Sequence, residues 1–578
     1  MIIRTYGWVQ NPSDFDKLKL VVQIFDPKSL HYANLTHNLV PNYIPLQRIK
    51  NQLLQKLNNH SDEFSYTELV GTSKNASGNP SKNRKEAIAD GLIQVTILPQ
   101  SSKTTGKMWT DNWTADGYLR WALSLNFVKH DRETDLCKIT DLGLKFSASP
   151  SKSNTEQDIL RKALLSYPPA SQVLNILEKA KVPVTKFYIG KQLGFSGEKG
   201  FTSYDEALMK DWFVTGSIEE QKKIKSDIEG TSDKYARMIC NWLEKVGYVT
   251  KQATTVKTDN GEKAGFQNYS ITARGIHALN QANGSSKNNR VKKFLTWEFL
   301  AVDGKNKNYV RSRRAYILQF LKTTKSFSSL INSLRTLGFN DDIEIIRNDI
   351  HGLNNFGIRI EDNGNVINLK DDFFDFSIPN LDLTAELKDK AADAVKAKFL
   401  KLTGLSMKYI ELLDIAYDSS RNRDFEILTA DLFKNVYGLD AMHLGGGRKP
   451  DAIAQTSHFG IIIDTKAYGN GYSKSISQED EMVRYIEDNQ QRSITRNSVE
   501  WWKNFNSSIP STAFYFLWVS SKFVGKFDDQ LLSTYNRTNT CGGALNVEQL
   551  LIGAYKVKAG LLGIGQIPSY FKNKEIAW

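Results

Sequence analysis

The most distinct strand signal lies in the C-terminal third of the chain. An apolar run at residues 459–463, Phe-Gly-Ile-Ile-Ile, is followed directly by the polar triplet Asp464-Thr465-Lys466. A short uninterrupted apolar run is typical of a strand that is buried on both faces. Successive side chains of a strand point to opposite faces, so Asp464 and Lys466 are expected on the same side. The pattern predicts a carboxylate and an ammonium group next to each other where the strand leaves the core.

Two segments in the first half of the chain repeat one pattern. Residues 121–128 and 242–249 each begin with Trp, pass through Asn or Gly, and end in an apolar pair. Asn and Gly suit the left-handed conformation that ends a helix. An Ile-Thr-x-x-Gly step from strand to helix follows at residues 139–143 and 271–275. Recognition helix, strand, wing, strand and helix is the order of a winged helix-turn-helix, and we expect two such units.

A third and weaker copy follows the first two. Residues 353–358 end a helix at Gly, residues 361–364 can form a wing turn, and residues 366–369 can form the returning strand. Units of this kind also occur as packing modules that bind nothing. Three copies on a basic chain favour DNA binding.

The remaining patterns predict a mixed α/β sandwich at the C-terminus. Residues 388–398 read as a charged helix, residues 425–438 as an amphipathic helix closed by Gly, and residues 513–520 as a second core strand. Residues 477–480, Ser-Gln-Glu-Asp, resemble the capping box that opens a helix. Glu426, on the amphipathic helix, could lie near a metal, but we expect it on the solvated surface. Helices alternating with strands place the site at the edge of a sheet.

Composition narrows the class of protein. The chain has 578 residues, enough for three or four domains, and a formal net charge of +13. A basic surplus favours a polyanionic partner, although an acidic membrane surface is an alternative. No apolar run approaches the eighteen or so residues that a spanning helix needs. The three cysteines, Cys137, Cys240 and Cys541, show no zinc spacing, and the N-terminus has no signal-peptide pattern. We expect a soluble intracellular protein without a membrane partner.

The candidate chemistry lies around the first strand. Asp451 ends the segment Gly-Gly-Gly-Arg-Lys-Pro-Asp at residues 445–451, and it could bring a second carboxylate to Asp464. Two carboxylates suit a hard divalent cation such as Mg²⁺. Lys466 beside the metal could orient or help to deprotonate an attacking water and could offset charge on a phosphate. The alternative is a structural ion pair at a strand end, and the pattern alone leaves both open.

These motifs resemble those of a known family. Residues 445–451 and 463–468 are similar to the catalytic core of the PD-(D/E)xK nucleases, and more narrowly to the cleavage domain of FokI-like type IIS restriction endonucleases. The likeness extends to residues 443–446 and 478–485 and covers almost the whole chain. It implies that Asp451, Asp464 and Lys466 are catalytic and that the two aspartates hold Mg²⁺.

The resemblance also implies DNA-contacting residues, which lie in an N-terminal arm and in the first two winged-helix units: Gln10, Asn11, Arg84, Trp113, Glu229, Lys234 and Arg237. Lys234 and Arg237 are three residues apart on one helix face, where they could contact guanine, although such a pair is also common on a solvated surface. Residues 225–228 depart from the family's Asn-rich run, and residues 72–83 do not align cleanly, which leaves the recognition sequence and the role of Arg84 open.

Asp480 and Arg484 allow two interpretations. They are four residues apart on a predicted helix and could form an ordinary intrahelical pair. In the family that the chain resembles, the matching residues bond their counterparts across a two-fold axis, and this resemblance favours a dimer contact.

The sequence therefore predicts a multidomain α+β protein with three winged helix-turn-helix-like subdomains at residues 1–152, 153–288 and 289–380, the third a scaffold. A PD-(D/E)xK α/β nuclease domain follows at residues 383–578. We expect a type IIS restriction endonuclease of the bacterial cytoplasm. It would bind a short asymmetric double-stranded DNA site, cut both strands at a fixed distance outside it as a transient homodimer, and require a separate methyltransferase for host protection. The alternatives are a site-specific nickase and a winged-helix transcription regulator with an inactive nuclease-like domain.

Overall fold

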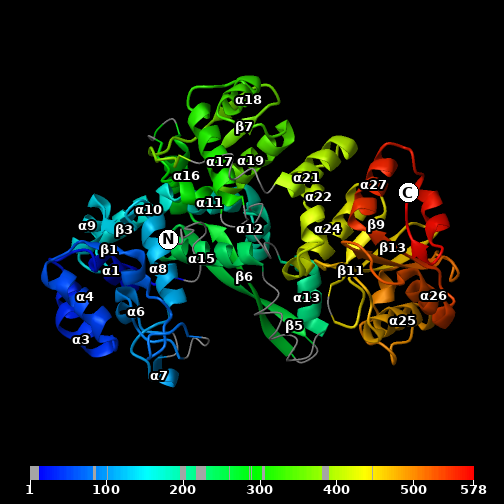
Figure 1. Ribbon diagram of the computed structural model, residues 1–578, viewed down its shortest axis with the longest axis horizontal. Helices are drawn as coiled ribbons and strands as arrows, with labels where there is room; N and C mark the ends of the chain where they lie inside the picture. Colours follow the sequence, from blue (N-terminus) through cyan, green and yellow to red (C-terminus); the bar gives the residue numbers. More distant parts are fainter. Residues whose placement is uncertain are drawn as a thin grey trace.

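The computed structural model describes residues 12–81, 86–99, 102–194, 203–215, 230–258, 261–285, 287, 290–301, 306–380, 390–445 and 447–578. Three N-terminal subdomains are followed by a C-terminal domain built on a sheet of its own (Figure 1). The predicted multidomain α+β class is confirmed.

The first subdomain consists of short helices and a small antiparallel sheet with the strand order β1-β3-β2. Its elements are α1 (Phe15–Gln23), α2 (Leu30–Asn34), α3 (Val40–Tyr43), α4 (Gln47–Asn58), β1 (Glu63–Ser65), α5 (Tyr66–Val70), α6 (Leu92–Thr96), α7 (Ser102–Thr105), α8 (Asn112–Ser124), β2 (Val128–Asp131), β3 (Leu136–Ile139) and α9 (Asp141–Ala148). Asn126 ends α8 with a φ of 58°, and the Thr140 hydroxyl caps α9 by accepting a bond from the Gly143 amide. The predicted helix–strand–strand–helix order is present.

The second subdomain repeats this plan with a longer hairpin. Its elements are α10 (Asn154–Ser166), α11 (Pro168–Ala180), β4 (Val184–Thr185), α12 (Lys186–Gln192), α13 (Glu206–Thr215), α15 (Thr231–Lys245), β5 (Val249–Thr258), β6 (Gly261–Ile271) and α16 (Ala273–Asn283). Gly247, with a φ of 79°, follows α15, and Thr272 caps α16 through the Gly275 amide. The Ile-Thr-x-x-Gly step therefore has the same geometry in both units.

The third subdomain is held together by buried charge. Its elements are α17 (Lys307–Leu321), α18 (Phe327–Thr336), α19 (Ile343–Phe356), β7 (Ile360–Asp362) and β8 (Ile367–Leu369). Arg313 and Arg314 of α17 both donate to the buried Asp349 carboxylate of α19, at 2.6 and 2.7 Å. Both arginines are thus paired with a carboxylate of the same subdomain, and the scaffold role expected for it stays a prediction.

One apolar core runs through all three N-terminal subdomains, from Leu18 to Phe373. They therefore pack as a continuous body.

The C-terminal domain is a six-stranded mixed sheet covered on both faces by helices. Its elements are α21 (Lys390–Thr403), α22 (Met407–Ile410), α23 (Leu412–Ile415), α24 (Asn422–Asn435), β9 (Asp440–His443), β10 (Ala452–Gln455), β11 (Gly460–Lys466), α25 (Ile476–Gln491), β12 (Phe514–Ser520), α26 (Phe527–Thr538), β13 (Gly542–Asn546), α27 (Val547–Lys558) and β14 (Lys574–Glu575). The strand order is β14-β13-β12-β11-β10-β9. Strand β11 pairs antiparallel with β10 and parallel with β12.

The apolar run of β11 fills two cores. Ile461 and Ile463 pack with α24 and α27 on one face, whereas Ile462 packs with α25 and α26 on the other. This alternation is why an uninterrupted apolar run predicts the strand correctly.

One predicted helix start was wrong. Helix α25 begins at Ile476, and its N-cap is Ser475, which forms a capping box with Gln478. The predicted cap, Ser477, lies inside the first turn, because Ser475 and Gln478 make the same Ser-x-x-acceptor pattern two residues earlier.

Among the helices that the structure describes, none combines the length and the apolar composition needed to cross a membrane.

Candidate active site and DNA interface

The strand pair β10–β11 brings the three predicted catalytic side chains together. Asp451 immediately precedes β10, and Ala452 pairs with Ile463 of β11. The Asp451 Oδ2 atom accepts hydrogen bonds from the Thr465 amide at 2.7 Å and from its hydroxyl at 3.1 Å. On the next residue, the Lys466 ammonium donates to Asp464. We call Asp451, Asp464 and Lys466 the carboxylate edge.

The carboxylate edge is buried and electrostatically coupled. Burial raises the pKa of the Asp464 carboxyl, and the charge of Asp451 raises it further, whereas Lys466 opposes both. Burial alone would lower the pKa of Lys466, but the carboxylates of Asp464 and Asp451 outweigh it and raise that pKa. Lys466 is therefore held as an ammonium ion, next to two acidic groups whose charges repel each other.

The donor set of this edge fits a divalent cation. Asp451 and Asp464 repel each other when both are ionised. A bound cation would offset this repulsion and stabilise the ionised pair. Within the described ranges, no group of three or more His, Cys, Asp or Glu side chains forms a metal cluster. A pair of carboxylates agrees with a hard ion that keeps several of its waters, as Mg²⁺ does.

The position of Glu426 corrects our expectation. This side chain of α24 is largely buried, not solvated, and it bonds His443 Nε2 of β9 at 3.1 Å. Burial raises the pKa of Glu426, and Asp451 raises it further. The sequence alone did not show that Glu426 is largely buried, because its burial depends on how α24 packs on the sheet.

A tyrosine of the second subdomain reaches this region. The Tyr204 ring stacks on His443 with centroids 4.8 Å apart and an interplanar angle of 12°, and its hydroxyl donates to Glu426 at 3.2 Å. The Arg423 guanidinium lies 4.6 Å from the centroid of the same ring. The second subdomain therefore contacts the C-terminal domain beside the carboxylate edge, a contact that no local sequence pattern predicts.

The predicted DNA-contacting residues that the structure describes lie at the starts of two matching helices. Trp113 is on the first turn of α8 and is 53% exposed. Lys234, exposed, and Arg237, half-buried, are near the start of α15. The other predicted contacts, Gln10, Asn11, Arg84 and Glu229, lie outside the described residues.

Lys186 is a basic residue that the sequence analysis missed. It begins α12, which packs against α15. Burial lowers the pKa of Lys186 to about 8, and the neighbouring charges of Arg237 and Lys234 also lower it. Three cations thus gather at the start of α15. The signal in the sequence was Thr185, a helix cap directly before Lys186.

The two predicted dimer residues have different partners. Asp480 bonds Arg537 of α26 at 2.7 Å, and Arg484 lies 3.9 Å from Glu481. The buried Nε atom of Arg484 has no hydrogen-bond partner in the described part of the chain. The intrahelical pair between Asp480 and Arg484, one of the two interpretations, is not formed.

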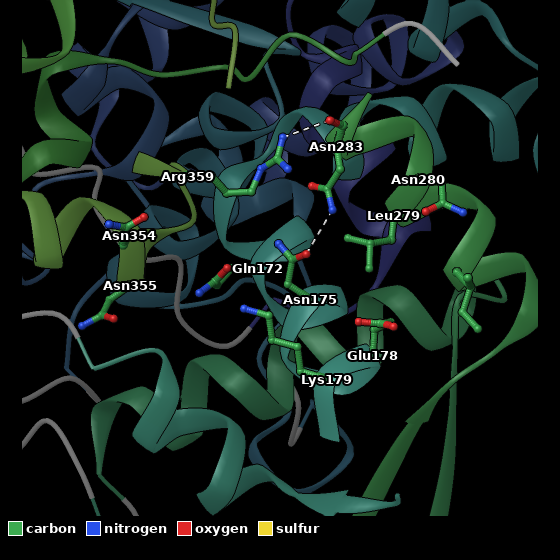
Figure 2. Close-up of a pocket in the computed structure, with 11 residues that line it drawn as sticks. Gln172, Asn175, Glu178, Lys179, Leu279, Asn280, Asn283, Asn354, Asn355 and Arg359 are labelled. Carbon is green, nitrogen blue, oxygen red and sulfur yellow. Dashed lines mark hydrogen bonds between the residues drawn. The ribbon is translucent and has the colours of Figure 1, made fainter. Parts of the chain in front are cut away.

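A polar cleft of about 620 Å³ lies between the second and third subdomains (Figure 2). In Figure 2 the Asn283 side chain donates to Asn175, and Arg359 donates to the Asn283 carbonyl. These bonds join α11 and α16 to the segment after α19. The cleft is thus part of the packing between subdomains.

Comparison with known proteins identifies the family. Four family models match successive parts of the chain: the FokI recognition domain subdomain 1 at residues 4–149, subdomain 2 at 156–287, the D3 domain at 300–365 and the FokI cleavage domain at 386–577. The type II restriction enzyme FokI of Planomicrobium okeanokoites is 41% identical, with 99% of both chains covered. The chain belongs to the FokI family of type II restriction enzymes.

Other members of the FokI family agree with this assignment. The type II restriction enzyme StsI of Streptococcus sanguinis is 29% identical over 96% of this chain and 92% of its own. The solved structure of FokI matches with a TM-score of 0.89, and that of FokI bound to DNA with 0.88, each at 40% identity and with both chains fully covered. The relationship thus extends over the whole FokI architecture.

Proposed function

We propose that this chain is a type IIS restriction endonuclease. It binds a short asymmetric double-stranded DNA site through the subdomains at residues 1–152 and 153–288, with residues 289–380 as the scaffold. The domain at residues 383–578 hydrolyses phosphodiester bonds of both strands at a fixed distance outside the site. The observation that carries the proposal is the meeting of Asp451, Asp464 and Lys466 at one edge of the sheet.

Each residue of the carboxylate edge has a role in this reaction. Asp451 and Asp464 would hold Mg²⁺, which supplies Lewis-acid activation of the phosphate and of water when bound. Asp451 is fixed in place by the Thr465 amide and hydroxyl, so its free oxygen remains available. Lys466, which keeps its proton, orients the attacking water by hydrogen bonding and offsets negative charge on the phosphate. The raised pKa favours this role over that of a general base.

DNA recognition uses the starts of α8 and α15. Trp113 would pack against bases, whereas Lys234 and Arg237 would donate to guanine or to phosphates. Gln10, Asn11, Arg84 and Glu229 complete the proposed set by resemblance to the FokI family. Lys186 adds a third cation beside Lys234 and Arg237 and strengthens the attraction for the phosphate backbone.

Cutting of both strands requires two cleavage domains. We assign Asp480 and Arg484 to the contact between them by resemblance to the FokI family, and both side chains are partly exposed, 54% for Asp480 and 37% for Arg484. In a two-fold contact each Arg484 would face the Asp480 of the other copy. The bond from Arg537 to Asp480 competes with that contact, which favours a dimer that forms transiently. The enzyme would act in the bacterial cytoplasm beside a separate methyltransferase that protects host DNA.

A digest of a long mixed-sequence duplex tests the proposal. With Mg²⁺ we expect discrete fragments, and sequencing their ends should give one asymmetric site with a constant offset on both strands. Discrete single-strand breaks without fragments would support a nickase. Specific binding without any cleavage, at all Mg²⁺ concentrations, would support a transcription regulator, although the intact Asp451, Asp464 and Lys466 argue against it.

A further inference from the structure

The two recognition helices meet through matching residues. Trp121 of α8 and Trp242 of α15 stack with ring centroids 4.8 Å apart and an interplanar angle of 17°. Both side chains are fully buried. Phe15 stacks on Trp121 at 5.1 Å, so three rings from three segments form one stack. We call Phe15, Trp121 and Trp242 the tryptophan seam.

Trp121 and Trp242 occupy the same position in the two winged-helix units. Each is followed after five residues by the positive-φ residue that ends its helix, Asn126 or Gly247. Each is followed after seven residues by the first strand residue, Val128 or Val249. The seam therefore joins equivalent positions of the two units.

The same register places the proposed DNA contacts at equal distances from the seam. Trp113 and Lys234 each precede their seam tryptophan by eight residues. Eight residues of α-helix span about 12 Å. A tilt of roughly 15° at the seam would thus move the start of either helix by about 3 Å, which is close to the rise of one base pair. Small changes at the seam would therefore change which base pairs the two helices reach together.

The chain segment before α1 is anchored at the same place. The Trp242 indole N–H donates to the Pro12 carbonyl at 2.8 Å, and the Lys245 ammonium donates to the Ser13 carbonyl. The seam thus holds the segment that follows Gln10 and Asn11, as well as both recognition helices.

We propose that the tryptophan seam is a positioning device for DNA specificity: the stack of Trp121 on Trp242 fixes the spacing at which α8 and α15 read one asymmetric site. Trp121 and Trp242 are buried and act through the helices they join, so they are positioning residues without DNA contacts. The inference rests on the proposed DNA recognition by these two helices. The proposal predicts that, without the stack, the protein accepts sites in which the base pairs read by α8 and α15 are spaced differently. A uniform loss of affinity for all sites would not have this effect.

The test measures binding to spacing variants of the site without divalent cation, so that no DNA is cut. The probes are duplexes with the site found in the digest and duplexes with one base pair inserted or removed at each internal position. We expect the unchanged protein to bind the spacing variants at least about 100-fold more weakly than the site, because an inserted or removed base pair misplaces several base contacts at once. The ratio of the affinity for the site to the affinity for a spacing variant is the quantity measured. For W121A and W242A we expect this ratio to fall to roughly tenfold or less for at least one spacing variant. The double variant should lower this ratio by less than the product of the two single effects, because each single variant already removes the stack between Trp121 and Trp242.

Three further variants separate positioning from folding. Phe146 stacks on Phe127 inside the first subdomain with centroids 4.5 Å apart, and Phe146→Ala removes a buried stack that does not cross the seam. Phe146→Ala should lower thermal stability, but its ratio of affinities for the site and the spacing variants should equal that of the unchanged protein. If the alanine variants at the seam do not fold, W121F and W242F retain an aromatic ring and should reduce the ratio by a smaller factor.

The outcomes are distinguishable. Folded seam variants, alanine or phenylalanine, that keep the full ratio, even with weaker binding overall, would overturn the positioning role. An unchanged protein that prefers no site would instead overturn the proposed function.

Discussion

Tyr204 of the second recognition subdomain stacks on His443 of the cleavage domain, with ring centroids 4.8 Å apart and an interplanar angle of 12°. The Tyr204 hydroxyl also bonds Glu426, whose carboxyl lies close enough to Asp451 to have its pKa raised. The contact links the part of the chain that we assign to DNA reading with the part that we assign to cutting. Because Tyr204 also feels the charge of Asp451, we expect this contact to restrain the cleavage domain before DNA binds.

We therefore predict that Tyr204→Ala speeds cleavage. Its stack on His443 is worth about 0.5–1.5 kcal/mol, and the loss of that energy would favour release of the cleavage domain by roughly two- to tenfold. Single-turnover cleavage with saturating enzyme measures this rate. Tyr204→Phe keeps the ring and loses the hydroxyl contacts with Glu426 and Arg423, so its effect should be smaller. A rate equal to or below that of the unchanged protein for Tyr204→Ala would show that the contact does not restrain cleavage.

Loss of Asp464 should separate binding from cutting. Asp464→Ala removes one of the two carboxylates proposed to hold Mg²⁺, and we expect cleavage to fall by at least about a thousandfold. Specific binding, measured by mobility shift without Mg²⁺, should stay unchanged, because Asp464 lies on β11 of the cleavage domain, whereas the proposed base contacts lie on α8 and α15. Asp464→Asn is the matched variant of similar shape. Cutting at the normal rate by either variant would remove Asp464 from the active site.

Charge reversal tests the proposed dimer contact. Asp480→Arg alone and Arg484→Asp alone should each convert double-strand cutting largely into nicking, because like charges would face each other across the two-fold axis. An equal mixture of the two variants should restore double-strand cutting, since each Arg then faces an Asp.

Arg537→Gln is the control for this experiment. It removes the partner of Asp480 within the chain and leaves Asp480 free for the contact, so double-strand cutting should be maintained or increased. If both reversals retain full double-strand cutting, the two residues lie outside the dimer interface.

Lys234→Ala distinguishes base reading from phosphate binding. A guanine contact predicts that specific affinity falls by about 1–3 kcal/mol while nonspecific affinity is kept. A phosphate contact predicts an equal loss of affinity for all sequences. It also predicts that the slope of log affinity against log salt concentration becomes shallower by about one. Fluorescence anisotropy at several salt concentrations gives both quantities. Lys179→Ala, an exposed lysine on α11 beside the polar cleft, should change neither. No change in either quantity for Lys234→Ala would exclude it from the interface.

Asp349 should control the stability of the third subdomain. Burial alone would raise its pKa, but Arg313 and Arg314 outweigh burial and lower it. A lowered folded-state pKa gives stability that is present above the unfolded value, near 4, and lost as pH falls through the folded value. Asp349→Ala leaves two buried arginines without their shared carboxylate, and we expect a loss of about 3–5 kcal/mol. Thermal unfolding at pH 7 measures the loss, and unfolding at the same temperature as the unchanged protein would contradict it.

The sequence by itself determined the features that depend on neighbouring residues. The apolar run before Asp464 determines a strand buried on both faces, and the one-residue separation of Asp464 and Lys466 puts them on one side of it. The positive-φ residues Asn126 and Gly247 end two helices, as residues that tolerate that conformation do. These signals are local, because dihedral preference and side-chain alternation act over a few residues. The prediction of Ser477 as the cap of α25 was wrong although a helix cap is also a local feature, because Ser475 lies two residues earlier and offers the same pattern.

Only the tertiary structure decided which distant residues meet. The bond from Thr465 to Asp451, the stack of Tyr204 on His443 and the stack of Trp121 on Trp242 each join separate elements. No pattern along the chain contains their distances, because these follow from how whole faces of helices and sheets pack. For the same reason Glu426, expected at the surface, is largely buried: its environment depends on what covers its helix, and His443 of β9 and Tyr204 of the second subdomain cover it.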